Sequence, residues 1–131
     1  MLAKRLLSHI LNNEALTRGL GDPEARLLVE WLVEQAEDLA DQHHQADAAV
    51  EQALVARVER LCRRARSVGR FVALWCSRGG RAAAVQLAAT ERFHWPLPTT
   101  TVDPCELLQA ILDWEASHPL PEPAPRRQAA A

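Results

Sequence analysis

The spacing of leucine and other apolar residues is the feature of this sequence that most constrains its fold. Leu2, Leu6 and Ile10 recur at intervals of four residues, which places them on one face of a helix. Similar spacing continues through most of the chain, and no run alternates apolar and polar residues as a half-buried strand does. We therefore predict an all-α protein, a bundle of four to five helices.

Glycine and proline residues divide this pattern near the start of the chain. Gly19 and Gly21 end the first helical segment, and the stretch "GDPE" follows. Asp22 can cap a helix there, and Pro23 suits the first helical position, where its missing N–H costs nothing. The second helix is predicted to run from Pro23 to about Gln42.

Two later breakers bound the remaining helices. The stretch "RGG" separates a long helix, roughly 46–77, from a shorter one over 81–93. The stretch "DPCE" then begins the last helix, with Asp103 as its cap and Glu106 placed to complete a capping box. This last helix is predicted to end by His118.

The length of 131 residues suits one domain with a real core. We assign that domain to residues 1–118. The following stretch, 119–131, reads "PLPEPAPRRQAAA"; it has four prolines and little to bury, which predicts a disordered proline-rich tail.

Composition narrows the class of protein. A net charge of -2 argues against a dedicated nucleic-acid binder. Three scattered cysteines without metal-type spacing indicate reduced thiols. No signal peptide or membrane-length apolar run is present. Arginine greatly outnumbers lysine, as expected from a GC-rich genome. We expect a bacterial, cytoplasmic protein with no membrane association.

Charge is segregated on the two longest predicted helices. The third helix carries five arginines within eleven residues, on the half opposite its apolar stripe: Arg60, Arg63, Arg64, Arg66 and Arg70. The second helix is acidic on the face opposite its leucines, where a stripe is formed by Glu30, Glu34, Glu37 and Asp41. Each charged face is the one that helix geometry leaves to solvent.

Three interpretations of the arginine face follow. The favoured one is that the acidic helix pairs with it along their flanks, which would set orientation more than stability. The second is a phosphate-binding face, although no aromatic residue interleaves the arginines for stacking on bases. The third is an acidic protein partner, including another copy of this chain.

Two Glu-x-x-His pairs invite a metal hypothesis, because such pairs supply ligands in di-iron bundles. They are Glu91 with His94 and Glu115 with His118. Both histidines lie near prolines at predicted helix ends, where neighbouring side chains cannot hold metal ligands in place. The stretch 41–47, "DQHHQAD", is interpreted as a solvated turn. We predict no metal, no cofactor and no catalytic residue.

Two tryptophans lie away from the main apolar stripes. Trp31 is at the acidic edge of the second helix, and Trp95 is in a proline-rich connection. Each is either a rim residue of the core or part of a contact surface, since tryptophan is enriched at binding hot spots.

One short pattern carries a family resemblance. An L-x3-A-x3-G-R-x3-L pattern over fourteen residues is formed by Leu61, Ala65, Gly69, Arg70 and Leu74. It resembles the end of the bacterial effector-associated, death-like helical adaptor domains. The family has an aromatic residue before the alanine, where this chain has Arg64. The resemblance implies a protein-interaction module and transfers no functional residue.

The sequence therefore predicts a non-enzymatic helical interaction module, such as an adaptor, small subunit or regulatory protein. A nucleic-acid-associated subunit is the alternative, and a carboxylate–histidine metal-binding bundle is less favoured. The predicted interaction surface comprises the five arginines, the four acids of the second helix, Trp31 and Trp95. A protein partner or self-association is expected.

Overall fold

The computed structural model describes residues 2–43, 45, 47–95 and 103–118. Within them the chain forms five α-helices and one short 3-10 helix, and the predicted all-α fold is confirmed. The elements are α1 (Leu2–Leu11), η1 (Glu14–Thr17), α2 (Asp22–Gln42), α3 (Ala48–Cys76), α4 (Arg81–Thr90) and α5 (Pro104–Ser117). The predicted tail, 119–131, lies outside the described residues.

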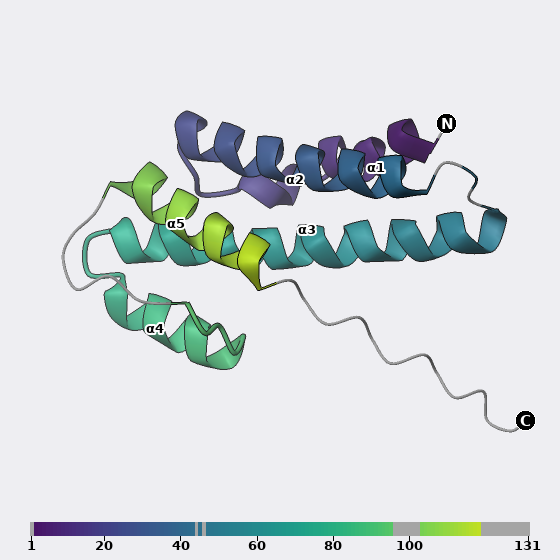
Figure 1. Cartoon of the computed structure of the whole chain (residues 1–131). Helices are drawn as coiled ribbons and strands as arrows, with labels where there is room; N and C mark the ends of the chain where they lie inside the picture. The colour runs from purple at the N-terminus through teal and green to yellow at the C-terminus, as the bar shows by residue number, and fades with distance from the viewer. Residues whose placement is uncertain (1, 44, 46, 96–102, 119–131) are drawn as a thin grey trace, which may run out of the picture.

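The two longest helices, α2 and α3, lie side by side and antiparallel, and the other helices pack around them (Figure 1). The amino-terminal helix α1 contacts both α2 and α3. Helix α5 also contacts both, at the opposite end of the pair, while α4 packs against the carboxyl-terminal part of α3. Every other element therefore contacts α3, which is the centre of the bundle.

The core is built from the apolar faces of several helices. Leu6, Leu28, Phe71 and Leu108 come from four different helices, and all are fully buried. On α2 the predicted stripe of Leu28, Leu32, Ala36 and Leu39 is buried throughout. Burying such side chains stabilises the fold by about 1.5–3 kcal/mol each, relative to leaving them exposed.

Two predicted helix boundaries differ from the structure. Helix α2 begins at Asp22, and Gly21 is its N-cap without a side-chain hydrogen bond. The prediction that Asp22 is the N-cap is wrong by one residue. Pro23 is therefore the second helical residue and not the first, a position in the first turn where proline is also tolerated. Helix α4 ends at Thr90 because Arg92 adopts a left-handed φ of 55° and the Phe93 N–H bonds to the Ala88 carbonyl.

Two aspartates cap helices through their side chains. Asp103 accepts hydrogen bonds from the backbone N–H groups of Cys105 and Glu106 at 3.0 and 3.3 Å, which confirms the predicted start of α5. Asp47 accepts one from Val50 at 2.9 Å and begins α3. None of the described helices has an apolar stretch sufficient to span a bilayer.

Candidate interaction surfaces

A groove opens between α2, α3 and the carboxyl-terminal end of α5. Helix α5 covers the seam between the two long helices, but it ends at Ser117. The groove has a volume of about 180 Å³. Its walls are formed by Trp31, Gln35, Asp38, Leu39, Gln42, Arg57, Arg60, Leu61, Arg64, Glu115 and Ala116.

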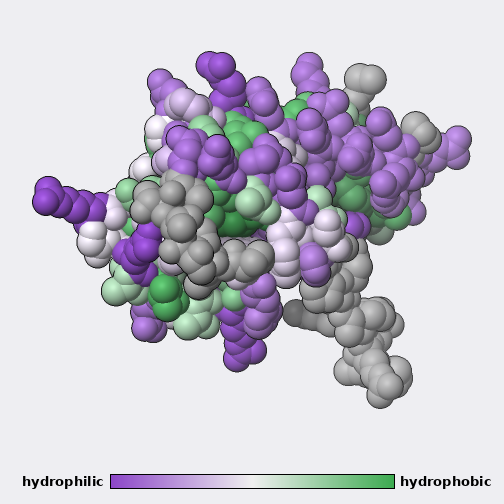
Figure 2. All heavy atoms as spheres, turned by 60° about the vertical axis from the view of Figure 1, so that its left-hand side comes forward, coloured by the Kyte–Doolittle hydropathy of each residue, from purple (hydrophilic) through white to green (hydrophobic). Residues whose placement is uncertain are grey.

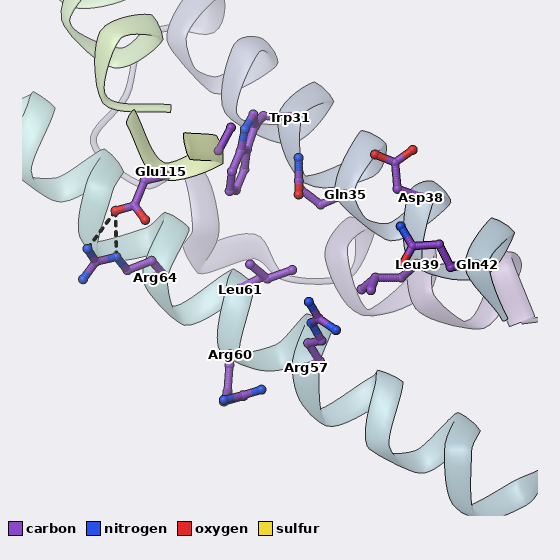
Figure 3. A pocket seen from close by; sticks show the side chains of 11 residues that line it. Trp31, Gln35, Asp38, Leu39, Gln42, Arg57, Arg60, Leu61, Arg64 and Glu115 are labelled. Carbon is purple, nitrogen blue, oxygen red and sulfur yellow. Dashed lines mark hydrogen bonds and ion pairs between the residues drawn. The ribbon is translucent and has the colours of Figure 1, made fainter. Parts of the chain in front are cut away.

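The groove combines an apolar base with a charged rim (Figure 3). Trp31, Leu39 and Leu61 are buried or half-buried and pack against the core. Arg57 extends from α3 toward the last turn of α2. Arg60 also lines the groove, but its side chain is directed away from α2. Sequence reasoning assigned Trp31 to either the core or a surface; the structure places it at the boundary between the two.

A buried carboxylate closes one end of the groove. Glu115 is 6% exposed, and its Oε1 accepts hydrogen bonds from Arg64 Nε at 2.9 Å and from Trp95 Nε1 at 2.7 Å. Arg64 Nη2 also lies 2.7 Å from the same oxygen (Figure 3). These donors compensate for removing the charge from water, and they tie α5 to α3.

A cluster of aromatic rings packs against Arg64 and Trp95, the two donors to Glu115. The rings of Phe93 and Trp95 stack with centroids 3.8 Å apart, and Trp95 meets Phe71 edge to face at 5.1 Å. The Arg64 guanidinium lies 4.3 Å from the Phe93 ring centroid, a cation–π contact. Trp95 is 5% exposed, so it belongs to the core and not to an exposed contact surface.

The structure separates the five arginines that the sequence groups together. Arg64 forms an ion pair with Glu115, and Arg60 lines the groove. Arg63, Arg66 and Arg70 are exposed, and the last two line a different hollow. Arg64 was predicted to be solvent-facing; it is half-buried because α5 packs over its side of α3, which helix periodicity alone does not reveal.

The acidic stripe of α2 is exposed at all four positions: Glu30, Glu34, Glu37 and Asp41. It lies opposite the buried leucine face of α2, which packs on α1, α3 and α5. Figure 2 shows hydrophilic residues along the upper edge of the molecule, where α1 and α2 lie. The acids of α2 and the exposed arginines of α3 thus face opposite sides, and the structure does not bring the two stripes together.

A second hollow, of about 530 Å³, lies between η1, α3 and α4. Arg66 and Arg70 line it from α3, and Arg18 adds a third cation from the end of η1. Glu91 is the acid among its lining residues, and Leu74 and Leu87 contribute apolar walls. Sequence reasoning missed Arg18, because it lies in a connection whose position only the packing of η1 on α3 decides.

The candidate metal ligands have other roles. Glu115 is held by Arg64, and His118 stacks on Trp114 with ring centroids 3.9 Å apart. His43 Nδ1 lies 2.8 Å from the main-chain carbonyl of Leu39. Within 2–43, 45, 47–95 and 103–118, no three histidine, cysteine or acidic side chains cluster as metal ligands would.

Comparison with protein-family models, curated proteins and solved structures found no match. The pattern that resembles death-like adaptor domains therefore rests on its own residues. Two of them have a structural role here. Ala65 is buried, and a side chain at Gly69 would meet Leu20 Cδ1 at 3.1 Å, so small residues let the η1 region and α2 approach α3 closely.

Proposed function

We propose that this protein is a non-enzymatic interaction module that binds an acidic, amphipathic helix of a partner protein in the groove beside α5. The observation that supports this most directly is the groove itself, with apolar Trp31, Leu39 and Leu61 below a rim containing Arg57 and Arg60. An amphipathic helix laid into an apolar groove is a recurring mode of recognition.

The dimensions of the groove support a side-chain anchor more than a small-molecule site. Its volume of about 180 Å³ is below the roughly 300–1,000 Å³ of typical ligand pockets. It continues the seam that α5 fills nearer the other end of α2, so a bound helix would extend packing already present in the bundle. Three arginines and two acids, Asp38 and Glu115, line the groove, and this excess of positive charge favours an acidic partner segment.

The test uses the full chain and a synthetic helical peptide with leucines at i, i+3 and i+7 and glutamates beside them. The indole N–H signal of Trp31, assigned with Trp31→Phe, is followed by NMR during titration. We expect a saturable shift of this signal. Arg60→Glu is expected to weaken binding about ten-fold, because it replaces an attraction by a repulsion at a partly buried rim.

Arg63→Glu is the matched control, since it makes the same charge change on the exposed side of the same helix. It is expected to leave the peptide affinity unchanged. Equal losses in both variants would mean that the peptide senses only net charge. Binding that appears only in a chain shortened to residues 1–118 would assign the groove to the chain's own segment 119–131. Either result would contradict the proposal.

Nucleic-acid binding is a second candidate function, favoured by one observation. Arg63, Arg66 and Arg70 are exposed together, and Arg18 lies beside two of them. With four phosphate contacts, log affinity for duplex DNA would fall with log salt at a slope of about -3.6. Unchanged DNA binding by Arg63→Glu/Arg66→Glu would remove this candidate.

The setting we propose is the cytoplasm. Cys62, Cys76 and Cys105 are free thiols, which a reducing compartment maintains.

A further inference from the structure

The molecule has two oppositely charged faces on opposite sides. One is the acidic face of α2, formed by Glu30, Glu34, Glu37 and Asp41, and the other is the basic face of α3, formed by Arg63, Arg66 and Arg70. All seven side chains are exposed, and no ion pair within the described residues involves any of them. Within the part of the chain that the structure describes, neither face is neutralised by an ion pair.

The two faces have matching spacing. From Glu30 the next acids follow after four and then three residues, and from Arg70 backward the arginines follow after four and then three residues. Because both segments are helical, each set spans about 10 Å along its axis. If the helices lay antiparallel, Glu30 would face Arg70, Glu34 would face Arg66 and Glu37 would face Arg63.

The surroundings of the basic face suit such a contact. Arg66 and Arg70 border the hollow between η1 and α4, which Arg18 also lines. Glu91 is the acid among its lining residues, so the hollow keeps an excess of positive charge for carboxylates from another helix. The contact is limited to about two turns, because the same register would bring Asp41 opposite Glu59. A short, mainly electrostatic contact is weak and depends strongly on salt.

We propose that the partner of the basic face is a second copy of this chain, which contributes the acidic face of its α2. This contact joins two different surfaces, so it is heterologous and leaves one free face of each kind at the ends of a dimer. The chain would therefore form short, open assemblies whose size rises with concentration. This interface is separate from the groove beside α5.

The experiment uses two variants of the full chain, each lacking one face, in sedimentation velocity at about 0.01 M salt, where screening is weak. The variants are Glu30→Gln/Glu34→Gln/Glu37→Gln and Arg63→Gln/Arg66→Gln/Arg70→Gln. All six positions are exposed on helices, and glutamine is a good helix former, so both variants should fold. Circular dichroism checks this directly.

The wild type is expected to associate as its concentration rises and to dissociate at about 1 M salt. Each variant alone should remain monomeric. Their equimolar mixture should form a heterodimer of twice the 14.6 kDa chain mass and grow no further, because only one complementary pair of faces remains. The charge-matched control Asp22→Asn/Glu106→Gln/Asp113→Asn should associate as the wild type does.

A mixture that remains monomeric would overturn the proposal. If it did so while the arginine variant also lost binding to duplex DNA, the basic face would be a nucleic-acid surface instead. Arg60→Glu should leave self-association intact, and both glutamine variants should still bind the acidic peptide. Failure of this inference is therefore distinguishable from failure of the proposed function.

Discussion

At the scale of single residues, Glu115 has the largest structural consequence. Its carboxylate is buried, and it receives donors from α3 and from the segment after α4. A buried charge with these partners stabilises little relative to an apolar replacement, but losing one partner leaves it uncompensated. Arg64 and Trp95 therefore both serve to compensate the Glu115 carboxylate, and we do not expect them to bind a partner protein.

Arg64→Met tests this role. It leaves the Glu115 carboxylate with Trp95 as its remaining donor. We expect the free energy of unfolding to fall by about 2–3 kcal/mol. This is at or below the low end for fully buried pairs, because Arg64 keeps some exposure. Urea denaturation measures the change. The double variant Arg64→Met/Glu115→Gln should recover most of the loss, because the neutral amide oxygen can still accept the hydrogen bond from Trp95 Nε1. An unchanged midpoint in the single variant would show that water replaces the guanidinium.

The buried thiol of Cys62 predicts a pH dependence. Burial, and then the nearby Glu59 carboxylate, raise the pKa of the Cys62 thiol above its ordinary value of 9.0. The folded state thus retains this proton when the unfolded state has lost it. The resulting stability is complete below the ordinary thiol pKa and is lost as pH rises through the raised value.

Chemical denaturation between about pH 8 and about pH 10.5 measures this effect, in a range otherwise dominated by lysine and tyrosine titration. The chain has no tyrosine and one lysine, so the background is small. The decline in unfolding free energy with rising pH should be shallower in Cys62→Ala than in the wild type. Cys76→Ala, at an exposed site, should change the slope less. Equal slopes in Cys62→Ala and wild type would contradict the assignment.

At the scale of elements, the turn between α3 and α4 depends on two glycines for different reasons. Gly79 adopts a φ of 73°, and a Cβ added there would meet nothing within 4 Å. Gly80 has an ordinary φ, but a Cβ there would clash with the Leu74 carbonyl oxygen. The first position is restricted by backbone conformation and the second by space.

Substitution by alanine separates these effects. Gly80→Ala should lower the free energy of unfolding by about 3 kcal/mol, because the clash is with backbone that cannot move aside. Gly79→Ala should cost only about 1 kcal/mol, the penalty of a left-handed alanine. Thermal unfolding of both variants provides the comparison. A larger loss for Gly79→Ala would show that backbone conformation, and not space, restricts this turn.

At the scale of the whole molecule, stability is unevenly distributed. Helix α3 contacts every other element, whereas α4 packs mainly on α3 and buries only Ala84 and Ala88. Little apolar surface therefore holds α4 in place, and local opening should precede global unfolding there.

Native-state hydrogen exchange tests this distribution. Amides in the second half of α4 should exchange with a free energy well below that of global unfolding and with little dependence on denaturant. Amides of Val68 and Val72 in α3 should exchange only through global unfolding. A single shared exchange profile for α3 and α4 would show instead that the bundle unfolds as one unit.

The sequence alone was sufficient to predict the helices, the buried face of α2 and the cap at Asp103. These depend on the period of the helix and on hydrogen bonds between near neighbours, so they are local. Helix ends were less predictable: the left-handed turn at Arg92 that ends α4 early carries no glycine or asparagine to announce it.

Only the tertiary structure decided what the charged side chains face. Arg63 and Arg64 are adjacent and both fall on the polar half of a helical wheel, yet α5 covers Arg64 and leaves Arg63 exposed. The acidic and basic stripes look complementary in sequence, but each lies opposite its own core face, so they point away from each other across the bundle. Periodicity determines which side of a helix is buried, and the order of packing determines what lies on its flanks.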